Sequence, residues 1–387
     1  MTDCTTINWT EDGEDRSAIW HSGNKTTAPR RIVIADDTMT ADVAYRLACE
    51  GTALLWRGDF QNARHLLQAL SRRISRPPHK RKQSKPAEPV TPTTAFNLHR
   101  RAQSLRARIL AMLLLPLSKD YTIPLRRAPD VRTACTEVYG AASGAALISL
   151  RELLGVIGAH EWRKKGVAVA ALGERIHPHY GVFSPVRGEY ADLVANTPLP
   201  AADSAFDIGT GTGVLAAILA RRGIQRIIAT DSDPRALACA ADNIARLGLA
   251  EQIRLIEADM FPPGRAALIV CNPPWIPARP ATAIEYAIYD PDSRMLRSFL
   301  HGLPEHLEPA GESWLILSDL AEHLGLRSRV ALLTMIANAG LHILGRSDIV
   351  PHHPKTADAT DPLYFARAAE VTSLWRLSLH PARDPGA

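Results

Sequence analysis

Two patterns of hydrophobic and polar positions divide the chain at about residue 168. Before that point, apolar residues recur mainly at helical spacing, as they do over residues 41–58, 59–74 and 96–117. After it, short apolar runs rich in β-branched residues alternate with helical patterns, which indicates a parallel sheet built from strand–helix–strand units. The pattern therefore predicts a mainly α-helical N-terminal domain followed by an α/β domain.

The expected domain boundaries lie where these patterns begin and end. Residues 1–37 have no sustained periodicity, which predicts a loose leader. Five prolines and several basic residues between Arg76 and Thr94 predict an extended linker. We expect the following segments in chain order: a helical hairpin over 38–75, the linker over 76–95, a helical N-terminal domain over 96–167, the α/β domain over 168–380 and a tail over 381–387.

Composition narrows the class of protein. Hydrophobic residues make up 46% of the 387 positions and charged residues 22%, as in ordinary soluble proteins. No apolar run reaches the roughly 18–20 residues that a membrane span requires, and the polar, acid-rich start differs from a signal peptide. The five cysteines are scattered without a Cys-x-x-Cys pair, which argues against a disulfide framework and a zinc site. These features predict a cytoplasmic protein that uses neither a metal nor a membrane.

Charge is unevenly distributed along the chain. Residues 64–132 contain 16 Lys and Arg against three acids, a charge of +13, so the remainder carries −8 of the net +5. This concentration of positive charge predicts contact with an anionic partner, such as RNA or a target bound to the ribosome. A solvated basic linker explains the same composition, and both interpretations stay open.

A glycine-rich turn is the first candidate ligand-binding motif of the C-terminal domain. The stretch FDIGTGTGVLAAILARRG, residues 206–223, has the pattern of a strand end, a turn and a helix. Gly209, Gly211 and Gly213 let the backbone bend tightly and let a ligand approach the amides at the helix start. Asp207 lies two residues before the first glycine. The GxGxG spacing differs from the GxGxxG of dinucleotide-binding proteins.

Three further strands are predicted to end in polar residues. Asp231 ends the second strand, 20 residues after Gly211, where a carboxylate can accept from both hydroxyls of a ribose. Asp259 ends the third strand and can accept from an exocyclic adenine amine, while Met260 packs on the ring. Asn272 follows the fourth strand and begins the run Asn-Pro-Pro-Trp. Because the carboxyl ends of parallel strands meet in one crevice, we expect these residues to share a ligand site.

The succession of Asp-x-Gly-x-Gly-x-Gly, a strand-end Asp, Glu-Ala-Asp and Asn-Pro-Pro-Trp resembles the class I S-adenosylmethionine-dependent methyltransferases. More narrowly, residues 177–379 resemble the methyltransferase small-domain group, which includes the HemK-type protein glutamine methyltransferases and several nucleobase N-methyltransferases. The resemblance implies a Rossmann-like, seven-stranded methyltransferase sheet, with a final antiparallel strand at residues 372–379. It also implies S-adenosylmethionine as the cofactor.

The same resemblance assigns roles around the cofactor. In such proteins the glycines pass close to the methionine part of S-adenosylmethionine, the second strand-end acid holds the ribose, and the third lies at the adenine. Residues 180–194 resemble the segment that covers the cofactor in HemK-like enzymes, although the usual Pro-Arg-Pro-Glu-Thr run is absent. The expected cofactor-binding residues are Asp207, Gly209, Gly211, Gly213, Asp231, Asp259, Met260 and Asn272.

The Asn-Pro-Pro-Trp loop suits methyl transfer to a planar –NH2 group. The lone pair of such a nitrogen is delocalised, so the nitrogen must be held close to the methyl donor and correctly oriented. The Asn272 side-chain carbonyl and the Pro273 backbone carbonyl can accept its two N–H bonds, and Trp275 offers a flat stacking surface. No strong base is required, because proximity and electrostatics supply the catalysis. The predicted catalytic residues are Asn272, Pro273 and Trp275.

Several classes of acceptor remain open. A protein glutamine side-chain amide matches the HemK-like enzymes, whose N-terminal helical domain grips the target. The exocyclic amine of a nucleobase in RNA or DNA is the alternative, and the basic residues 64–132 would suit its phosphates. A small molecule is a third acceptor. A non-catalytic protein that binds S-adenosylmethionine or RNA is a further alternative, but such a protein would have no need of an intact Asn-Pro-Pro-Trp loop.

Overall fold

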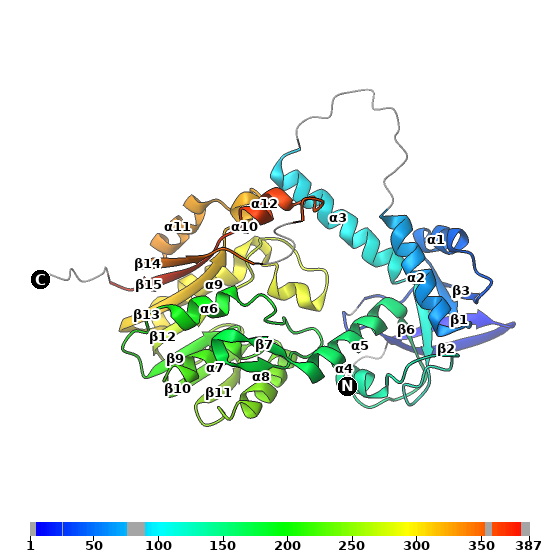
Figure 1. Cartoon of the computed structure of the whole chain (residues 1–387), viewed down its shortest axis with the longest axis horizontal. Helices are drawn as coiled ribbons and strands as arrows, with labels where there is room; N and C mark the ends of the chain where they lie inside the picture. The colour runs from blue at the N-terminus through cyan, green and yellow to red at the C-terminus, as the bar shows by residue number, and fades with distance from the viewer. Residues whose placement is uncertain (1–4, 25, 76–89, 353–357, 381–387) are drawn as a thin grey trace, which may run out of the picture. The chain divides into compact units, whose positions relative to one another are not determined.

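The computed structural model describes residues 5–24, 26–75, 90–352 and 358–380 (Figure 1). The chain forms two compact units, and each is built around its own sheet. The first unit comprises residues 1–90 and 97–161, and the second comprises residues 91–96 and 162–387. No helix in the described ranges has both the length and the apolar character needed to cross a membrane.

The second unit contains a seven-stranded sheet with the order β11-β10-β9-β12-β13-β15-β14. Neighbouring strands from β11 to β13 are parallel, and β15 is antiparallel to both β13 and β14. The expected Rossmann-like sheet is confirmed, and its antiparallel strand is the predicted one. The strands are β9 (Ser204–Ile208), β10 (Arg226–Asp231), β11 (Ile253–Glu257), β12 (Ala266–Cys271), β13 (Leu307–Ser318), β14 (His342–Ile349) and β15 (Thr372–Ser378).

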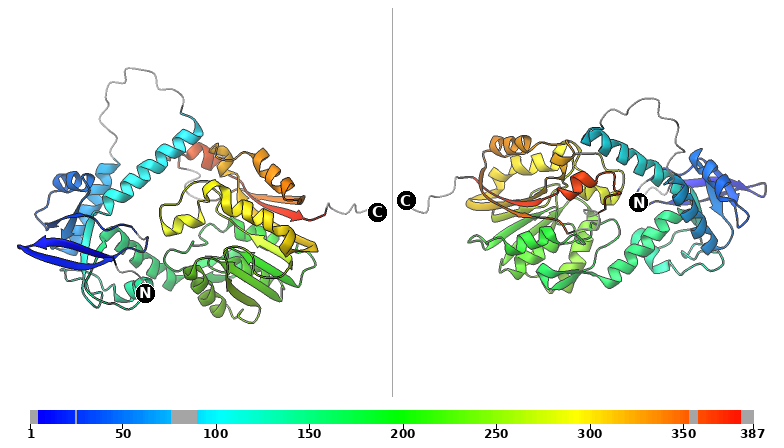
Figure 2. Two further views of the ribbon diagram at one scale, coloured as in Figure 1. Left: turned by 180° about the vertical axis from the view of Figure 1, so that it is seen from behind. Right: turned by 45° about the horizontal axis from the view of Figure 1, so that its top comes forward.

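Helices cover both faces of this sheet, as the views in Figure 2 show. On β12, Leu268 and Val270 join one apolar core, while Ile269 and Cys271 join the core on the other face. Helices α6, α7 and α8 complete the first core, and α9 and α11 complete the second. The helices are α6 (Glu189–Asn196), α7 (Val214–Arg221), α8 (Pro234–Arg246), α9 (Arg294–His306), α10 (Leu320–His323), α11 (Arg329–Asn338) and α12 (Tyr364–Ala368).

The first unit contains a six-stranded mixed sheet with the order β1-β2-β6-β5-β4-β3. Strands β3, β4 and β5 are parallel, and β6 is antiparallel to β5 but parallel to β2. The strands are β1 (Thr6–Glu11), β2 (Glu14–His21), β3 (Arg31–Ala35), β4 (Thr52–Trp56), β5 (Leu113–Leu117) and β6 (Ala146–Ser149). The helices are α1 (Ala41–Cys49), α2 (Phe60–Ile74), α3 (Pro92–Leu110), α4 (Arg132–Tyr139) and α5 (Leu150–Lys165).

The prediction of a mainly α-helical N-terminal domain is wrong, because short strands lie between the helices. β4, β5 and β6 are runs of four or five residues that are buried at every position. Such runs have neither helical nor alternating periodicity, so they are easily assigned to the neighbouring helices. The expected helical hairpin over 38–75 is α1, β4 and α2, and the expected helical domain over 96–167 contains β5 and β6.

The loose leader predicted over 1–37 is also wrong for the residues that the structure describes. β1 and β2 form an antiparallel hairpin. Its turn residues Asp12 and Gly13 both have positive φ, 54° and 79°, as in a tight type I′ turn. Most positions of these strands are exposed or half-buried and polar, and only Ile7 and Trp20 are buried. This weak apolar alternation explains why the sequence pattern did not predict the hairpin.

The linker predicted over 76–95 falls mostly on residues 76–89, which lie outside the described ranges, as does the tail predicted over 381–387. The last residues of that linker are helical, because α3 begins at Pro92. Proline fits the first turn of a helix, where its missing N–H has no partner in any case. The sequence pattern predicts that the α/β domain starts at residue 168. In the structure, the long segment of the second unit starts at residue 162.

We expect Trp20→Ala to lower the free energy of unfolding of the first unit by about 3–5 kcal/mol. The Trp20 side chain is 9% exposed and packs with Ile7, Leu55 and Leu114 in one core. Urea titration measures the change, and hydrogen exchange of the β2 amides assigns it to this unit. Asn8→Ala, at an exposed position of β1, is the control with little expected effect. Equal stability of the two variants would contradict the role of β2 in the core.

Candidate active site

Asp207 lies at the end of β9 and is only 1% exposed. Its Oδ2 accepts hydrogen bonds from the Thr210 hydroxyl (2.7 Å) and from the Ala216 amide in the first turn of α7 (3.1 Å). Burial raises the pKa of this carboxyl to about 6, and the two hydrogen bonds oppose that shift. Asp207, which the sequence placed among the cofactor-binding residues, therefore supports the glycine-rich turn and the helix start from inside the protein.

The glycine-rich turn is held against β10. Its glycines have positive φ, 73° at Gly209, 57° at Gly211 and 81° at Gly213, and the Gly209 amide donates to the Thr230 carbonyl at 2.9 Å. A Cβ on Gly213 would lie 3.3 Å from the Cβ of Ala240 on α8. A Cβ on Gly211 would meet nothing within 4 Å. The backbone at Gly211 is therefore the part of the turn beside open space.

Asp231, at the end of β10, connects this turn to the start of α8. Its Oδ2 accepts from the Gly211 amide at 3.0 Å, and its Oδ1 accepts from the Asp233 amide at 2.9 Å. Burial raises the pKa of the carboxyl, and these backbone hydrogen bonds oppose the shift. Each carboxylate oxygen has a second lone pair, so Asp231 can accept two more hydrogen bonds from a pair of ligand hydroxyls.

Asp259 and Met260 follow β11 at the same edge of the sheet. The exposed Asp259 carboxylate forms an ion pair with Arg294 at the start of α9, with N–O distances of 3.1 and 3.3 Å. Sequence reasoning did not identify this arginine, because 35 residues separate the two partners. The Met260 carbonyl accepts from the Thr230 hydroxyl at 2.7 Å, and its side chain packs against the core that contains α9. Both residues thus have fixed positions beside α9.

The Asn-Pro-Pro-Trp loop leaves the sheet beside the glycine-rich turn. β12 pairs in parallel with β9, and Cys271 lies opposite Ile208, so Asn272 follows alongside Gly209. The indole N–H of Trp275 donates to Asn272 Oδ1 at 2.8 Å. Sequence reasoning did not predict this hydrogen bond, which joins the two proposed catalytic side chains.

Trp275 is also part of the packing of the second unit. Its half-buried ring contacts three apolar clusters: the two cores of the sheet and a smaller cluster that includes Phe96 and Ile276. Pro273 is buried as well, while Asn272 and Pro274 are half-buried. The flat stacking surface expected of Trp275 is therefore used partly by the protein itself.

The chain after Trp275 folds back towards the glycine-rich turn. The amide of the buried Asp290 donates to the Ile276 carbonyl at 2.9 Å, and the Asp290 carboxylate accepts from the Met295 amide at 3.0 Å. This arrangement fixes the start of α9. A Cβ on Gly209 would lie 2.9 Å from the methyl carbon of Met295, so the first turn of α9 contacts the glycine-rich turn.

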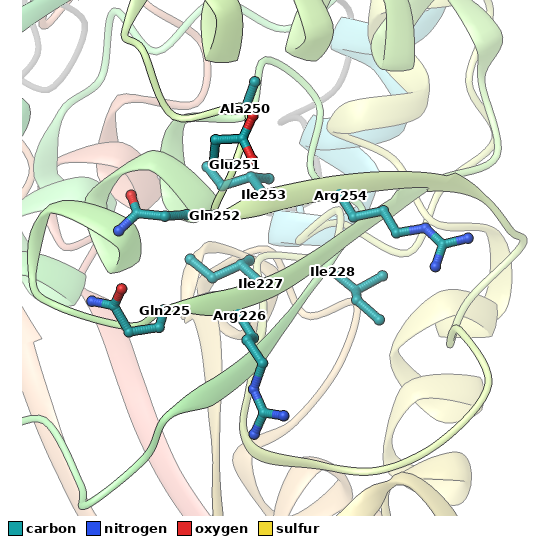
Figure 3. Close-up of a pocket in the computed structure, with 9 residues that line it drawn as sticks. All are labelled: Gln225, Arg226, Ile227, Ile228, Ala250, Glu251, Gln252, Ile253 and Arg254. Atoms are coloured by element: carbon teal, nitrogen blue, oxygen red, sulfur yellow. The ribbon is translucent and has the colours of Figure 1, made fainter.

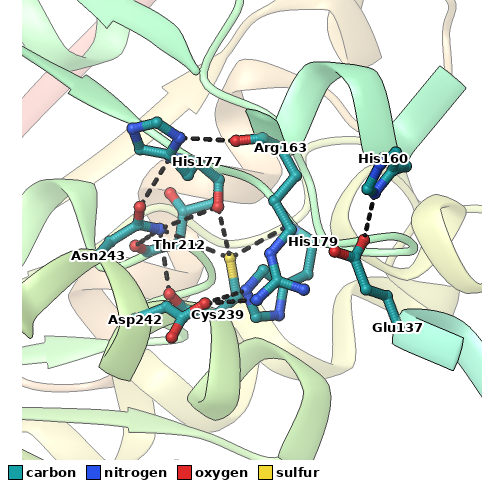
Figure 4. A network of polar contacts seen from close by, with 9 residues as sticks. All are labelled: Glu137, His160, Arg163, His177, His179, Thr212, Cys239, Asp242 and Asn243. Atoms are coloured by element: carbon teal, nitrogen blue, oxygen red, sulfur yellow. Dashed lines mark hydrogen bonds and ion pairs between the residues drawn. The ribbon is translucent and has the colours of Figure 1, made fainter. Parts of the chain in front are cut away.

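A buried asparagine on α8 connects the same turn to the chain that precedes β9 (Figure 4). Asn243 Nδ2 donates to the Thr212 carbonyl at 3.1 Å, and Asn243 Oδ1 accepts from the His177 amide at 2.7 Å. Beside it, Asp242 Oδ2 lies 2.9 Å from His179 Nε2. The residues around position 178 are thereby attached to α8. Sequence reasoning missed these contacts, because nothing in the local pattern of α8 distinguishes a buried asparagine that bridges distant segments.

The segment over 180–194, predicted to cover the cofactor, is attached to the end of β13. Arg187 Nη2 donates to Oε2 of the buried Glu370 at 3.3 Å. Glu370 Oε1 accepts from the Ser318 hydroxyl at 2.8 Å, and Ser318 is the last residue of β13. The carboxyl end of another strand of the sheet therefore anchors this segment.

A hollow of about 240 Å³ lies at the amino ends of two strands, away from the carboxyl ends that carry the candidate site (Figure 3). It is lined by residues 225–228 and 250–254, at the amino ends of β10 and β11. Asp231 and Asp259 lie at the other ends of these strands, so the hollow is separate from the candidate site.

Comparisons with known proteins show what the chain is similar to. Residues 174–338 match the family described as methyltransferase small domain, as the motifs predicted. A release factor glutamine methyltransferase of Cereibacter sphaeroides is 34% identical over 176 residues, which are 42% of this chain and 58% of the relative. A ribosomal protein uL3 glutamine methyltransferase of Bradyrhizobium diazoefficiens is 30% identical over 156 residues, 36% of this chain and 46% of the relative. The chain thus spans about half the length of these relatives.

The solved structures that match this chain are more distant in sequence. A ribosomal protein L11 methylase of Lactobacillus delbrueckii subsp. bulgaricus is 19% identical, with a TM-score of 0.37, over 54% of this chain and 87% of that one. A methyltransferase of Pyrococcus furiosus is 18% identical, with a TM-score of 0.39, over 57% of this chain and 96% of that one.

We expect Asp207→Asn to remove a pH dependence of stability. The Asp207 carboxyl has a pKa of about 6 in the folded protein, against about 3.9 in an unfolded chain. Between these values the folded protein binds a proton that the unfolded chain does not, so the stability that depends on Asp207 falls as the pH rises from about 4 to about 6. The fall is at most about 3 kcal/mol, since one pKa unit equals about 1.4 kcal/mol.

Urea titrations of the wild type and of Asp207→Asn at pH values of about 4.5 and 7 measure this effect. The variant is a close control, because its side-chain carbonyl can still accept from Thr210 and Ala216. The wild type should lose stability relative to the variant at the higher pH. A difference that does not change with pH would contradict the raised pKa.

Proposed function

We propose that this chain, whose residues 174–338 match the methyltransferase small-domain family, methylates a planar –NH2 nitrogen with S-adenosylmethionine as the methyl donor. The acceptor that we propose is the side-chain amide of a glutamine in a protein. One observation carries the proposal: the Asn-Pro-Pro-Trp loop and the glycine-rich turn leave adjacent parallel strands in register, with Cys271 opposite Ile208. An acceptor held by the loop therefore lies next to a cofactor held by the turn.

The residues at this edge of the sheet fit S-adenosylmethionine. Asp231 offers two further acceptor positions for the ribose hydroxyls, and the neighbouring backbone at Gly211 borders open space. Asp259 is held in place by Arg294 and is exposed, so it can accept from the adenine amine, and Met260 supplies an apolar contact. When bound, the cofactor supplies an electrophilic methyl group on a positively charged sulfur.

Asn272 and Pro273 orient the acceptor nitrogen in this proposal. Asn272 Oδ1 already accepts from Trp275, and its second lone pair can accept one N–H of the acceptor amide. The backbone carbonyl of Pro273 accepts the other N–H. Prolines at 273 and 274 restrict the loop, so little conformational entropy is lost on binding. The rate enhancement comes from orientation, and the surplus proton passes to solvent after the N–C bond has formed.

Trp275 acts as a positioning residue for Asn272. The apolar clusters around its ring fix the direction of the indole N–H. That N–H in turn fixes the plane of the Asn272 amide, so the carbonyl oxygen presents its free lone pair in one direction. A phenylalanine at this position would keep much of the packing and lose the donor.

Local charge and the known relatives support a protein acceptor. The relatives named above are glutamine methyltransferases of a release factor and of ribosomal protein uL3. Residues 276–290, which follow the loop, contain one arginine and two acids and expose Ile284 and Tyr286. Because Asp290 is buried, the exposed surface of this segment is apolar and close to neutral, which suits a peptide better than a chain of phosphates. We infer that the acceptor is a protein of the translation machinery.

Radiolabelled S-adenosylmethionine in a cell extract tests the activity and the acceptor together. The wild type should label material that protease degrades and nuclease does not. Asn272→Ala should lower this transfer at least about 100-fold, because it removes a group that orients the acceptor, while the loss of cofactor affinity measured by calorimetry should be much smaller. Asp231→Ala is the complementary control, and it should lose cofactor affinity.

Two outcomes would contradict this proposal. Equal labelling by the wild type and by Asn272→Ala would exclude the proposed catalytic loop. Label that nuclease releases would identify a nucleobase acceptor in place of a glutamine.

We expect Trp275→Phe to lower kcat about 3- to 10-fold and to leave the cofactor affinity unchanged. The substitution removes one hydrogen bond to Asn272, and such a bond contributes about 1 kcal/mol. Single-turnover kinetics with a labelled acceptor measures the effect, and Trp162→Phe, at a half-exposed ring elsewhere, is the control. An unchanged kcat for Trp275→Phe would show that the indole N–H does not position Asn272.

A further inference from the structure

In residues 64–75 and 90–132, the part of the basic segment that the structure describes, some arginines form ion pairs and others do not. Ion pairs within the first unit neutralise one group: Arg73 lies 2.9 Å from Asp42, and Arg127 lies 2.8 Å from Asp59. These arginines stabilise the fold of the unit. Four arginines of α2 and α3 make up the other group and are exposed to solvent.

The sequences of α2 and α3 contain seven arginines but neither an acid nor a lysine, over 15 and 19 positions. Four of these arginines are exposed, Arg64 and Arg72 on α2 and Arg101 and Arg108 on α3. None of the four forms an ion pair with an acid in the described part of the chain. Each pair is spaced by about two helical turns, or roughly 10–12 Å. The charge of these four arginines is therefore not neutralised by an ion pair within the described ranges.

The two helices form one surface region of the first unit. Arg106 on α3 donates to the Ser71 carbonyl at 3.2 Å and to the Ser75 hydroxyl at 2.7 Å, at the end of α2. Figure 1 shows the C-terminal half of α3 beside α2. The exposed arginines of the two helices are therefore available to the same partner.

The chemistry of this region favours RNA over an acidic protein. The guanidinium group of arginine pairs with phosphate through two parallel hydrogen bonds, which lysine cannot do. Leu98 and Leu105 are 55% and 45% exposed and alternate with Arg101 and Arg108 along one stripe of α3. Such apolar side chains can contact riboses and unpaired bases between the phosphates. A protein partner usually meets charges of both signs at an interface rim, and these helices offer only one.

We propose that α2 and α3 bind the phosphate backbone of RNA through Arg64, Arg72, Arg101 and Arg108. This binding goes beyond methyl transfer and does not require it.

Fluorescence anisotropy of the full chain with a labelled RNA hairpin tests the proposal without S-adenosylmethionine. For the wild type, the logarithm of the association constant should fall linearly with the logarithm of the salt concentration. Arg101→Gln/Arg108→Gln and Arg64→Gln/Arg72→Gln should each reduce the magnitude of this slope by about 1.4–1.8, since each phosphate contact contributes about 0.7–0.9. Affinity at low salt should fall at least about tenfold in each double variant.

Arg246→Gln/Arg254→Gln is the matched control, because it removes two exposed arginines of the second unit and the same amount of charge. Circular dichroism and urea unfolding establish that all three double variants are folded. The proposal is overturned if the control weakens RNA binding as much as the α3 variant does. It is also overturned if polyglutamate displaces the RNA at equal charge concentration, a result that would identify an acidic protein as the partner. Because no methyl transfer is measured, neither result bears on the proposed activity.

Discussion

A carboxylate with almost no access to water holds the centre of the second unit together. Burying a charged group is costly unless close hydrogen bonds compensate, and Asp207 receives one from the turn and one from the helix that follows it. These bonds, together with the Thr230 carbonyl, fix a turn in which three glycines have positive φ. The Gly211 amide then reaches Asp231. The residues at the crevice are therefore held in place by a group buried behind them.

The proposed chemistry also depends on neighbouring groups that hold the reacting residues in position. The rate of methyl transfer to an amide nitrogen depends little on a base and strongly on the orientation of the nitrogen. Small errors in its position therefore lower the rate considerably. The parallel register of β9 and β12 sets the distance between the loop and the turn, and the hydrogen bond from Trp275 sets the direction of the Asn272 carbonyl. Met295 and Arg294, both at the start of α9, contact the turn and Asp259 respectively. One helix thus contacts two of the strand ends that form the site.

The amino-acid sequence predicts the second unit better than the first for a physical reason. Strand-end acids, glycines with positive φ and a double proline are local features that a parallel sheet brings to one edge, so Asp231, Gly211 and Asn272 could be grouped from the sequence alone. The sheet of the first unit is made of short runs that are either wholly buried or mostly polar, and neither has a distinct periodicity. Long-range contacts such as Asn243 with Thr212 leave no local signal at all. The basic residues 64–132 were ambiguous because pairing with distant acids decides which arginines remain exposed.

The place of β15 in its sheet has a consequence for the synthesis of the protein. β15 lies between β13 and β14 and is paired with both, although it is the last of the seven strands to be made. β14 is made earlier, yet it joins the sheet through β15. While residues 372–378 are still inside the ribosome, one edge of β13 is unpaired. At that stage β14 also lacks the strand through which it pairs with the sheet. The sheet that carries the proposed site is therefore completed only after residues 372–378 have emerged, when its six other strands have already been made.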